Sequence, residues 1–267
     1  IYSDRREYAE QWGRIVDVSE LPSTFIPREG FIVSANDAPP DGRVAVGYFF
    51  SPPDRAMRLQ EMIRHLGKLD VPALKAMQAD VFSASSLMVR DRLLTQMTRL
   101  EVGDNIVTLA MRHWDGHYDS DSQGALAYQA FIAKFAQALY AARNARDELK
   151  AFTRLAYFED LLLQKAETTE DALLREVFER AKAEAAQLMQ RYEVWGDVHR
   201  LEVQHVMANI PFFGKRYKFA DLPTSGSRET VMKRAHGLIG EQPKGTYYGA
   251  QSRHISDMAD PNANYFV

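Results

Sequence analysis

The sequence predicts an α+β fold that is mostly helical, with a few strands near its two ends. Residues 1–53 are rich in Pro and Gly and contain two short apolar runs, at 30–35 and 44–50. Apolar runs bounded by turn residues are typical of buried strands. From 54 to 194, apolar residues recur three and four apart, as on the buried face of a helix. Residues 195–267 mix Gly with aromatics, which indicates turns and short strands. We expect these three parts to form one domain together with flanking chain.

The middle part is expected to be a series of helices. In the first, Met57, Met62 and Ile63 lie at helical spacing, and Asp54 is a candidate N-cap. Thr168 and Thr169, followed by acidic residues, predict another capped helix start. The apolar spacing predicts helices over 54–66, 71–82, 85–99, 105–114, 123–140, 152–164 and 169–192.

Composition excludes several classes of function. The chain has 267 residues, 46% of them hydrophobic, which is enough for a sizeable core. Its net charge of −3 does not provide the positive field that phosphate binding needs, so nucleic acid is not an expected partner. No apolar run approaches the ~20 residues of a membrane span. The absence of Cys excludes disulfides and a cysteine nucleophile within this chain.

Two histidine-containing segments are candidate sites with simpler explanations. His113 and His117 lie among three carboxylates, but Gly116 separates them, so they do not share a helix face as zinc-binding pairs do. We interpret this segment as a loop with a helix cap. His199, four residues after Trp195, and His205 could each act as a general base. No nucleophile accompanies them, and a buried histidine with satisfied hydrogen bonds is the more frequent case.

Asn36 is the candidate of most interest. It follows an apolar segment and precedes Pro39 and Pro40, so it lies where a predicted strand opens into a loop. A side-chain N–H placed there can stabilise an oxyanion during acyl transfer. Local sequence alone equally allows an Asx-turn residue that starts the loop.

Several motifs, in order and over nearly the whole chain, resemble the penicillin acylase family of N-terminal-nucleophile hydrolases. The motifs that carry the resemblance are Gly30-Phe-Ile-Val-Ser-Ala-Asn36, Pro52-Pro-Asp-Arg55, Met77-Gln78-Ala-Asp80, Trp114-Asp-Gly116, Trp195-Gly-Asp-Val-His199, Gly226-Ser-Arg-Glu-Thr230-Val and Arg253-His-Ile-Ser-Asp-Met258. The resemblance implies an αββα sandwich, a precursor that cleaves itself into two chains, and a serine at the start of the second chain whose own α-amino group is the base.

The resemblance also assigns roles to residues. Asn36 matches the asparagine that binds the oxyanion, Arg55 matches an arginine near the nucleophile and substrate, and Tyr48 matches an aromatic residue near the acyl pocket. Ile1 has no nucleophilic side chain. We therefore expect an interior segment of the nucleophile-bearing chain, inactive by itself.

The partners implied are the remaining chain or chains of the same processed precursor and a small acylated amine. No cofactor is required for the chemistry, but the complete enzyme is expected to bind a structural calcium, for which Asp41 is a loose positional candidate. Relatives are usually periplasmic or secreted. The alternative hypothesis is a helical binding or scaffold protein of the same architecture that has no catalytic activity.

Overall fold

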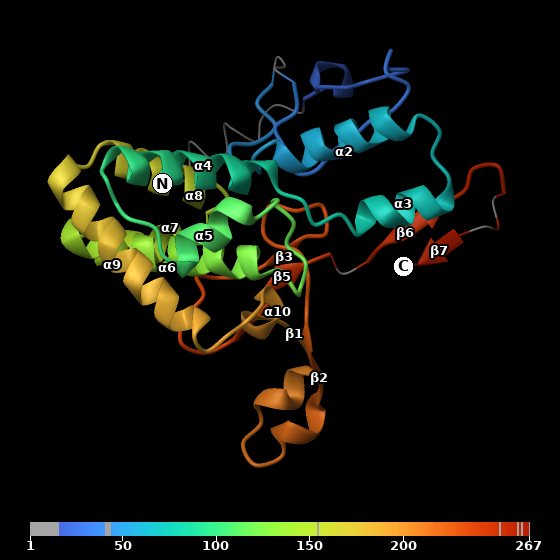
Figure 1. Cartoon of the computed structure of the whole chain (residues 1–267). Coiled ribbons are helices and arrows are strands. Elements are labelled where there is room, and N and C mark those ends of the chain that lie inside the picture. The colour runs from blue at the N-terminus through green and yellow to red at the C-terminus, as the bar shows by residue number, and fades with distance from the viewer. Residues whose placement is uncertain are drawn as a thin grey trace, which may run out of the picture.

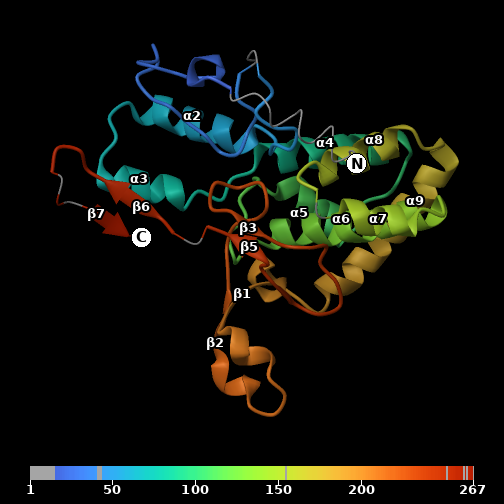
Figure 2. The same cartoon turned by 180° about the vertical axis from the view of Figure 1, so that it is seen from behind.

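The computed structural model describes residues 16–40, 44–153, 155–250, 252–260, 262 and 264–266. A helical body forms one side of the molecule, with α2 and α3 lying beyond one of its ends and a hairpin projecting from it (Figures 1 and 2). The helices are η1 (Val18–Glu20), α2 (Asp54–Leu66), α3 (Val71–Gln78), α4 (Ala84–Arg99), α5 (Ile106–His113), α6 (Gln123–Ala142), α7 (Arg146–Phe152), α8 (Phe158–Glu167), α9 (Asp171–Met189) and α10 (Trp195–Val198).

Local sequence explains where most of these helices begin. Ser83, Asn105 and Ser122 precede α4, α5 and α6, and each side chain accepts a hydrogen bond from a backbone N–H of the first turn. Each cap satisfies a donor that has no partner inside the helix. The α2 helix begins at Asp54, as its apolar spacing predicts, but its N-cap is Pro53 and no side chain caps it.

The core lies around α6, which is buried over most of its length because its sequence is apolar or small on every side. Phe131 and Phe135 of α6 stack on each other and on Phe178 of α9, with ring centroids 5.0–6.2 Å apart. Trp114 and Tyr118 close the end of the core nearest α10. The packing of α6 against α9 therefore holds the helical body together.

Two predictions in the α7–α9 region are wrong. A helix was expected over 152–164, but α7 ends at Phe152 and α8 begins only at Phe158. The predicted cap of α9 also fails, because the hydroxyls of Thr168 and Thr169 donate to carbonyls of the preceding helix α8 instead. Threonine makes both kinds of bond, and here the nearer unsatisfied carbonyls are at the α8 C-terminus.

The strands lie in the last third of the chain and form three small sheets. The largest has the order β2-β1-β4, in which β1 pairs antiparallel with β2 and parallel with β4. The strands are β1 (His199–Gln204), β2 (Lys218–Pro223), β3 (Arg234–Ala235), β4 (Lys244–Gly245), β5 (Tyr248–Gly249), β6 (His254–Ser256) and β7 (Asn264–Phe266). The α+β class and the mostly helical character are confirmed.

The strands predicted over 30–35 and 44–50 do not form among the described residues. Both segments are irregular, and Ser51 N–H donates to Asn36 O at 2.7 Å where they approach each other. Apolar, β-branched sequence favours extended chain, but a strand also needs a hydrogen-bonded neighbour, which these segments lack here. The division into parts at 53/54 and 194/195, and their union in one domain, stay predictions.

Candidate functional site

Asn36 sits in a turn that is fixed from both sides. Its backbone has φ 67°, in the left-handed region that Asn tolerates better than most residues. The preceding N–H, of Ala35, donates to Asp37 Oδ1 at 2.8 Å, and the Asn36 carbonyl accepts from Ser51. Ala35 is buried while Asn36 is exposed. The turn thus presents the Asn36 side chain outward from an anchored backbone.

Arg55, the second residue of α2, contacts this turn directly. Its Nη2 donates to Asn36 Oδ1 at 3.0 Å and to the Ala35 carbonyl at 2.5 Å. A guanidinium only donates, so it fixes the oxygen of the Asn36 amide toward Arg55 and the Nδ2 group away from it. Within the described residues, Nδ2 makes no hydrogen bond. The structure therefore brings together the two predicted catalytic residues and leaves one amide donor available.

Tyr48, the predicted substrate-binding residue, is not brought into this arrangement. Its side chain is 85% exposed, and that of Phe49 is 99% exposed. Neither lines a pocket among the residues that the structure describes. Its predicted contact with an acyl group therefore stays a prediction.

A pocket of about 350 Å³ adjoins the start of α2, next to the Asn36–Arg55 pair. It is lined by Asp54, Met57, Arg58, Gln60, Glu61 and Arg64 from α2, by Phe82, Ser83 and Ala84, and by Glu229. Arg58 is held in place by Asp80, whose carboxylate accepts its Nε and Nη2 at 3.2 and 2.8 Å. The pocket is thus a charged recess that borders the candidate site.

Glu229 is a residue that the sequence did not single out. Burial, followed by the nearby Glu159 carboxylate, raises the pKa of Glu229 to about 7, although Arg228 and Lys233 oppose the shift. Burial also lowers the pKa of Lys233, and the neighbouring Arg55 lowers it further. Glu229 belongs to one of the resemblance motifs, but no local pattern indicates that it would lie beside α2. An ionisable group with a shifted pKa in a recess is typical of a functional region.

Glu229→Gln is expected to remove a pH dependence of stability. Because its folded-state pKa lies above the ordinary 4.5, the native state binds the proton more tightly than the unfolded chain. Its contribution is complete below pH 4.5 and is lost as the pH rises through 7, by up to about 3 kcal/mol. Urea unfolding at pH 5 and pH 8 would measure this loss in the wild type and its absence in Glu229→Gln. Glu176→Gln, on the exposed face of α9, is the matched control. An identical pH dependence in both variants would contradict the assignment.

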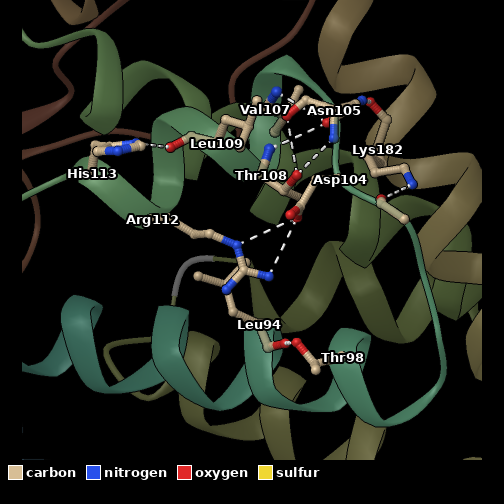
Figure 3. Close-up of polar contacts among 11 residues, drawn as sticks. Leu94, Thr98, Asp104, Asn105, Val107, Thr108, Leu109, Arg112, His113 and Lys182 are labelled. Carbon is tan, nitrogen blue, oxygen red and sulfur yellow. Dashed lines mark hydrogen bonds and ion pairs between the residues drawn. The ribbon is translucent and has the colours of Figure 1, made fainter.

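The largest recess, about 700 Å³, lies between α5 and α6 and has a different character. Its polar groups are used within the fold (Figure 3). Asn105 caps α5 and donates to the Lys182 carbonyl, the Lys182 ammonium donates to the Gly103 carbonyl, and Asp104 pairs with Arg112. No arrangement of nucleophile, base or oxyanion donor is found there, so we do not assign it a catalytic role.

The histidines of the sequence candidates have separate surroundings. His113 Nδ1 contacts the Leu109 carbonyl on its own helix, whereas His117 Nδ1 lies 3.2 Å from Asp115. His199 is buried, and its two ring nitrogens lie 2.8 and 3.1 Å from backbone carbonyls. This agrees with a buried histidine that has satisfied contacts.

Metal-binding groups and membrane-spanning helices were also sought in the described part of the chain. No three His, Asp or Glu side chains there are placed to hold a metal ion. Asp41, the loose calcium candidate, lies outside the described residues. Within the same residues, no helix combines the length and the apolar character needed to cross a bilayer.

Together, the fold and the site define an α+β protein that presents a backbone-anchored amide donor, oriented by an arginine, beside a charged recess. The sequence matches the penicillin amidase family over residues 3–267, and the chain belongs to that family. It is 25% identical over 269 residues to the penicillin acylase 2 proenzyme of Pseudomonas sp. (strain SE83). That alignment covers 94% of this chain and 34% of the relative, so the chain spans about a third of the relative's length.

Proposed function

We propose that this chain is part of an N-terminal-nucleophile amide hydrolase in which Asn36 binds the oxyanion. The observation that carries the proposal is the hydrogen bond from Arg55 to Asn36 Oδ1, which leaves Asn36 Nδ2 as a donor on an anchored turn. Membership of the penicillin amidase family supports the reaction class. The site is part of an αββα sandwich that other polypeptide of the same precursor completes.

The proposed reaction divides amide hydrolysis into two steps. A serine hydroxyl at the start of another polypeptide attacks the carbonyl carbon of the substrate, and its own α-amino group takes the proton. The carbonyl oxygen becomes negative, and Asn36 Nδ2 donates to it. The C–N bond then breaks, the amine leaves with a proton, and water later hydrolyses the acyl ester. A single oxyanion donor of this type is worth about 3–4 kcal/mol of barrier.

The proposed substrate is a linear amide of an acylated amine, such as a β-lactam side-chain amide or an acyl-homoserine lactone. The name of the relative, a penicillin acylase proenzyme, supports an acyl amide and a processed precursor. We further propose export to the periplasm or beyond, and a structural calcium in the complete enzyme. The chemistry itself requires no cofactor.

Mass spectrometry of the natively purified protein tests the proposal. A co-purifying polypeptide that begins with Ser, Thr or Cys, and is acylated at that residue when the substrate turns over slowly, is the expected result. A self-contained 267-residue monomer without amide turnover would support the helical scaffold hypothesis instead.

Arg55 is proposed as a positioning residue, so Arg55→Ala should raise KM and lower kcat together, by about 10–100-fold in kcat/KM. Without Arg55, the Asn36 amide can turn and present its oxygen, which would repel the oxyanion. Arg55→Lys, which keeps the charge and a donor, should recover part of the rate. The measurement is kcat and KM across pH 5–9. Wild-type values of both parameters in Arg55→Ala would contradict the role, and an unchanged pH profile would argue against an action of Arg55 on the amino base.

A further inference from the structure

The hairpin formed by β1 and β2 carries a compact lobe, residues 205–219, that projects away from the helical body (Figures 1 and 2). Two short 3₁₀ helices, η2 (Val206–Asn209) and η3 (Gly214–Tyr217), fold against each other in it. Gly214 N–H donates to the Ile210 carbonyl at 2.8 Å. A Cβ on Gly214 would lie 2.1 Å from the Ala208 carbonyl oxygen, so only glycine permits this packing. The hairpin lobe is therefore a folded unit with a defined surface.

That surface is apolar to an unusual degree. The exposed large apolar side chains of the lobe are Val206, Met207, Ile210, Phe212, Phe213 and Phe219. Phe212 is 100% exposed. Single exposed apolar residues are ordinary, but a contiguous group on one projecting element marks an interaction surface.

The backbone at Phe212 supports the same conclusion. Its φ is 67°, in the left-handed region where a bulky residue is strained. Within the described residues the ring is fully exposed, so no burial in this chain offsets that strain. Strained residues persist where a contact that matters for function compensates for the strain. We conclude that Phe212 is presented for a contact outside this chain.

The charge of the lobe indicates the chemistry of that contact. Between Glu202 and Asp221, the charged residues are Lys215, Arg216 and Lys218, with no carboxylate among them. The chain as a whole has a net charge of −3. A locally basic, aromatic surface on an otherwise acidic protein is complementary to an apolar recess with carboxylates at its edge.

We propose that the hairpin lobe docks on the nucleophile-bearing polypeptide of the same precursor, with the Phe212 ring in an apolar recess edged by carboxylates. This inference rests on the function proposed above, which places the nucleophile outside this chain. The relative is about three times as long as the segment that matches, so it has ample polypeptide to cover the lobe. A second copy of this chain or an anionic lipid surface would meet the same side chains, and the experiment separates these outcomes.

Cysteine accessibility in the complete, processed protein tests the proposal, because this chain contains no native Cys. Phe212→Cys and Val206→Cys place thiols on the lobe, and Val206→Cys leaves the Phe212 anchor intact. Asp147→Cys is the control, since the Asp147 side chain is 97% exposed on α7. Maleimide labelling, quantified for each peptide by mass spectrometry, should be at least about tenfold slower at both lobe positions than at 147. The three rates should become equal in urea.

Other outcomes overturn the proposal in distinguishable ways. Equal labelling rates in a sample that contains the nucleophile-bearing polypeptide would overturn the docking inference and leave the proposed function standing. Slow labelling that becomes fast on dilution would assign the surface to a second copy, and slow labelling that detergent abolishes would assign it to lipid. If no nucleophile-bearing polypeptide co-purifies, both proposals fall.

Discussion

Asn36→Ala in the complete protein is expected to lower amide turnover by about 10²–10³-fold while the fold stays intact. The change removes Nδ2, the donor that the Arg55 contact leaves available, and with it the proposed stabilisation of the oxyanion. Steady-state kinetics with a chromogenic amide would measure kcat and KM, and circular dichroism would report the fold. We expect most of the loss in kcat, because the interaction forms mainly in the transition state.

Two control variants separate the side chain from the backbone. The positive φ of Asn36 strains an alanine but not a glycine, so Asn36→Gly removes the amide without that strain. Asn36→Asp keeps an acceptor for Arg55 but has no N–H donor. All three variants should lose activity to a similar extent. Wild-type turnover in Asn36→Gly would remove Asn36 from the mechanism.

His199→Ala is expected to lower the free energy of unfolding by about 3–5 kcal/mol. The ring is buried and stacks on Trp195 at 4.5 Å between centroids, so its loss leaves a cavity. It also leaves the Thr224 and Arg234 carbonyls without the ring nitrogens that contact them. Both carbonyls belong to the segment that leads to and from Glu229. Urea unfolding at pH 7 would measure the loss.

The pH dependence of stability gives an independent check on His199. Burial lowers the pKa of His199 to about 4, although its carbonyl partners oppose the shift. The native state therefore binds this proton more weakly than the unfolded chain, where the pKa is 6.5. Its contribution is complete above pH 6.5 and is lost as the pH falls toward 4, by up to about 3 kcal/mol. His199→Ala should remove that loss, and exposed His113→Ala should retain it. An acid transition unchanged by His199→Ala would contradict this account.

The candidate site shows how far sequence can lead. Asn36 and Arg55 were selected from the residues and the family resemblance, and their contact across 19 positions agrees with that selection. The sequence did not show that Arg55 turns the amide, because a side-chain contact depends on where α2 packs. Glu229 was missed for the same reason. Its distance from Asp54 along the chain is large, and only the fold brings both to one pocket.

The sequence by itself determined the α+β class, most helices of the body and the family. Apolar spacing and cap residues such as Ser83, Asn105 and Ser122 act within one or two helical turns, so they can be read locally. Tertiary structure alone decided that 30–35 and 44–50 are not strands, that Thr168 and Thr169 close α8, and that Arg55 orients Asn36. Each of these depends on which hydrogen-bonding partner lies within reach, and that is fixed only when distant segments pack together.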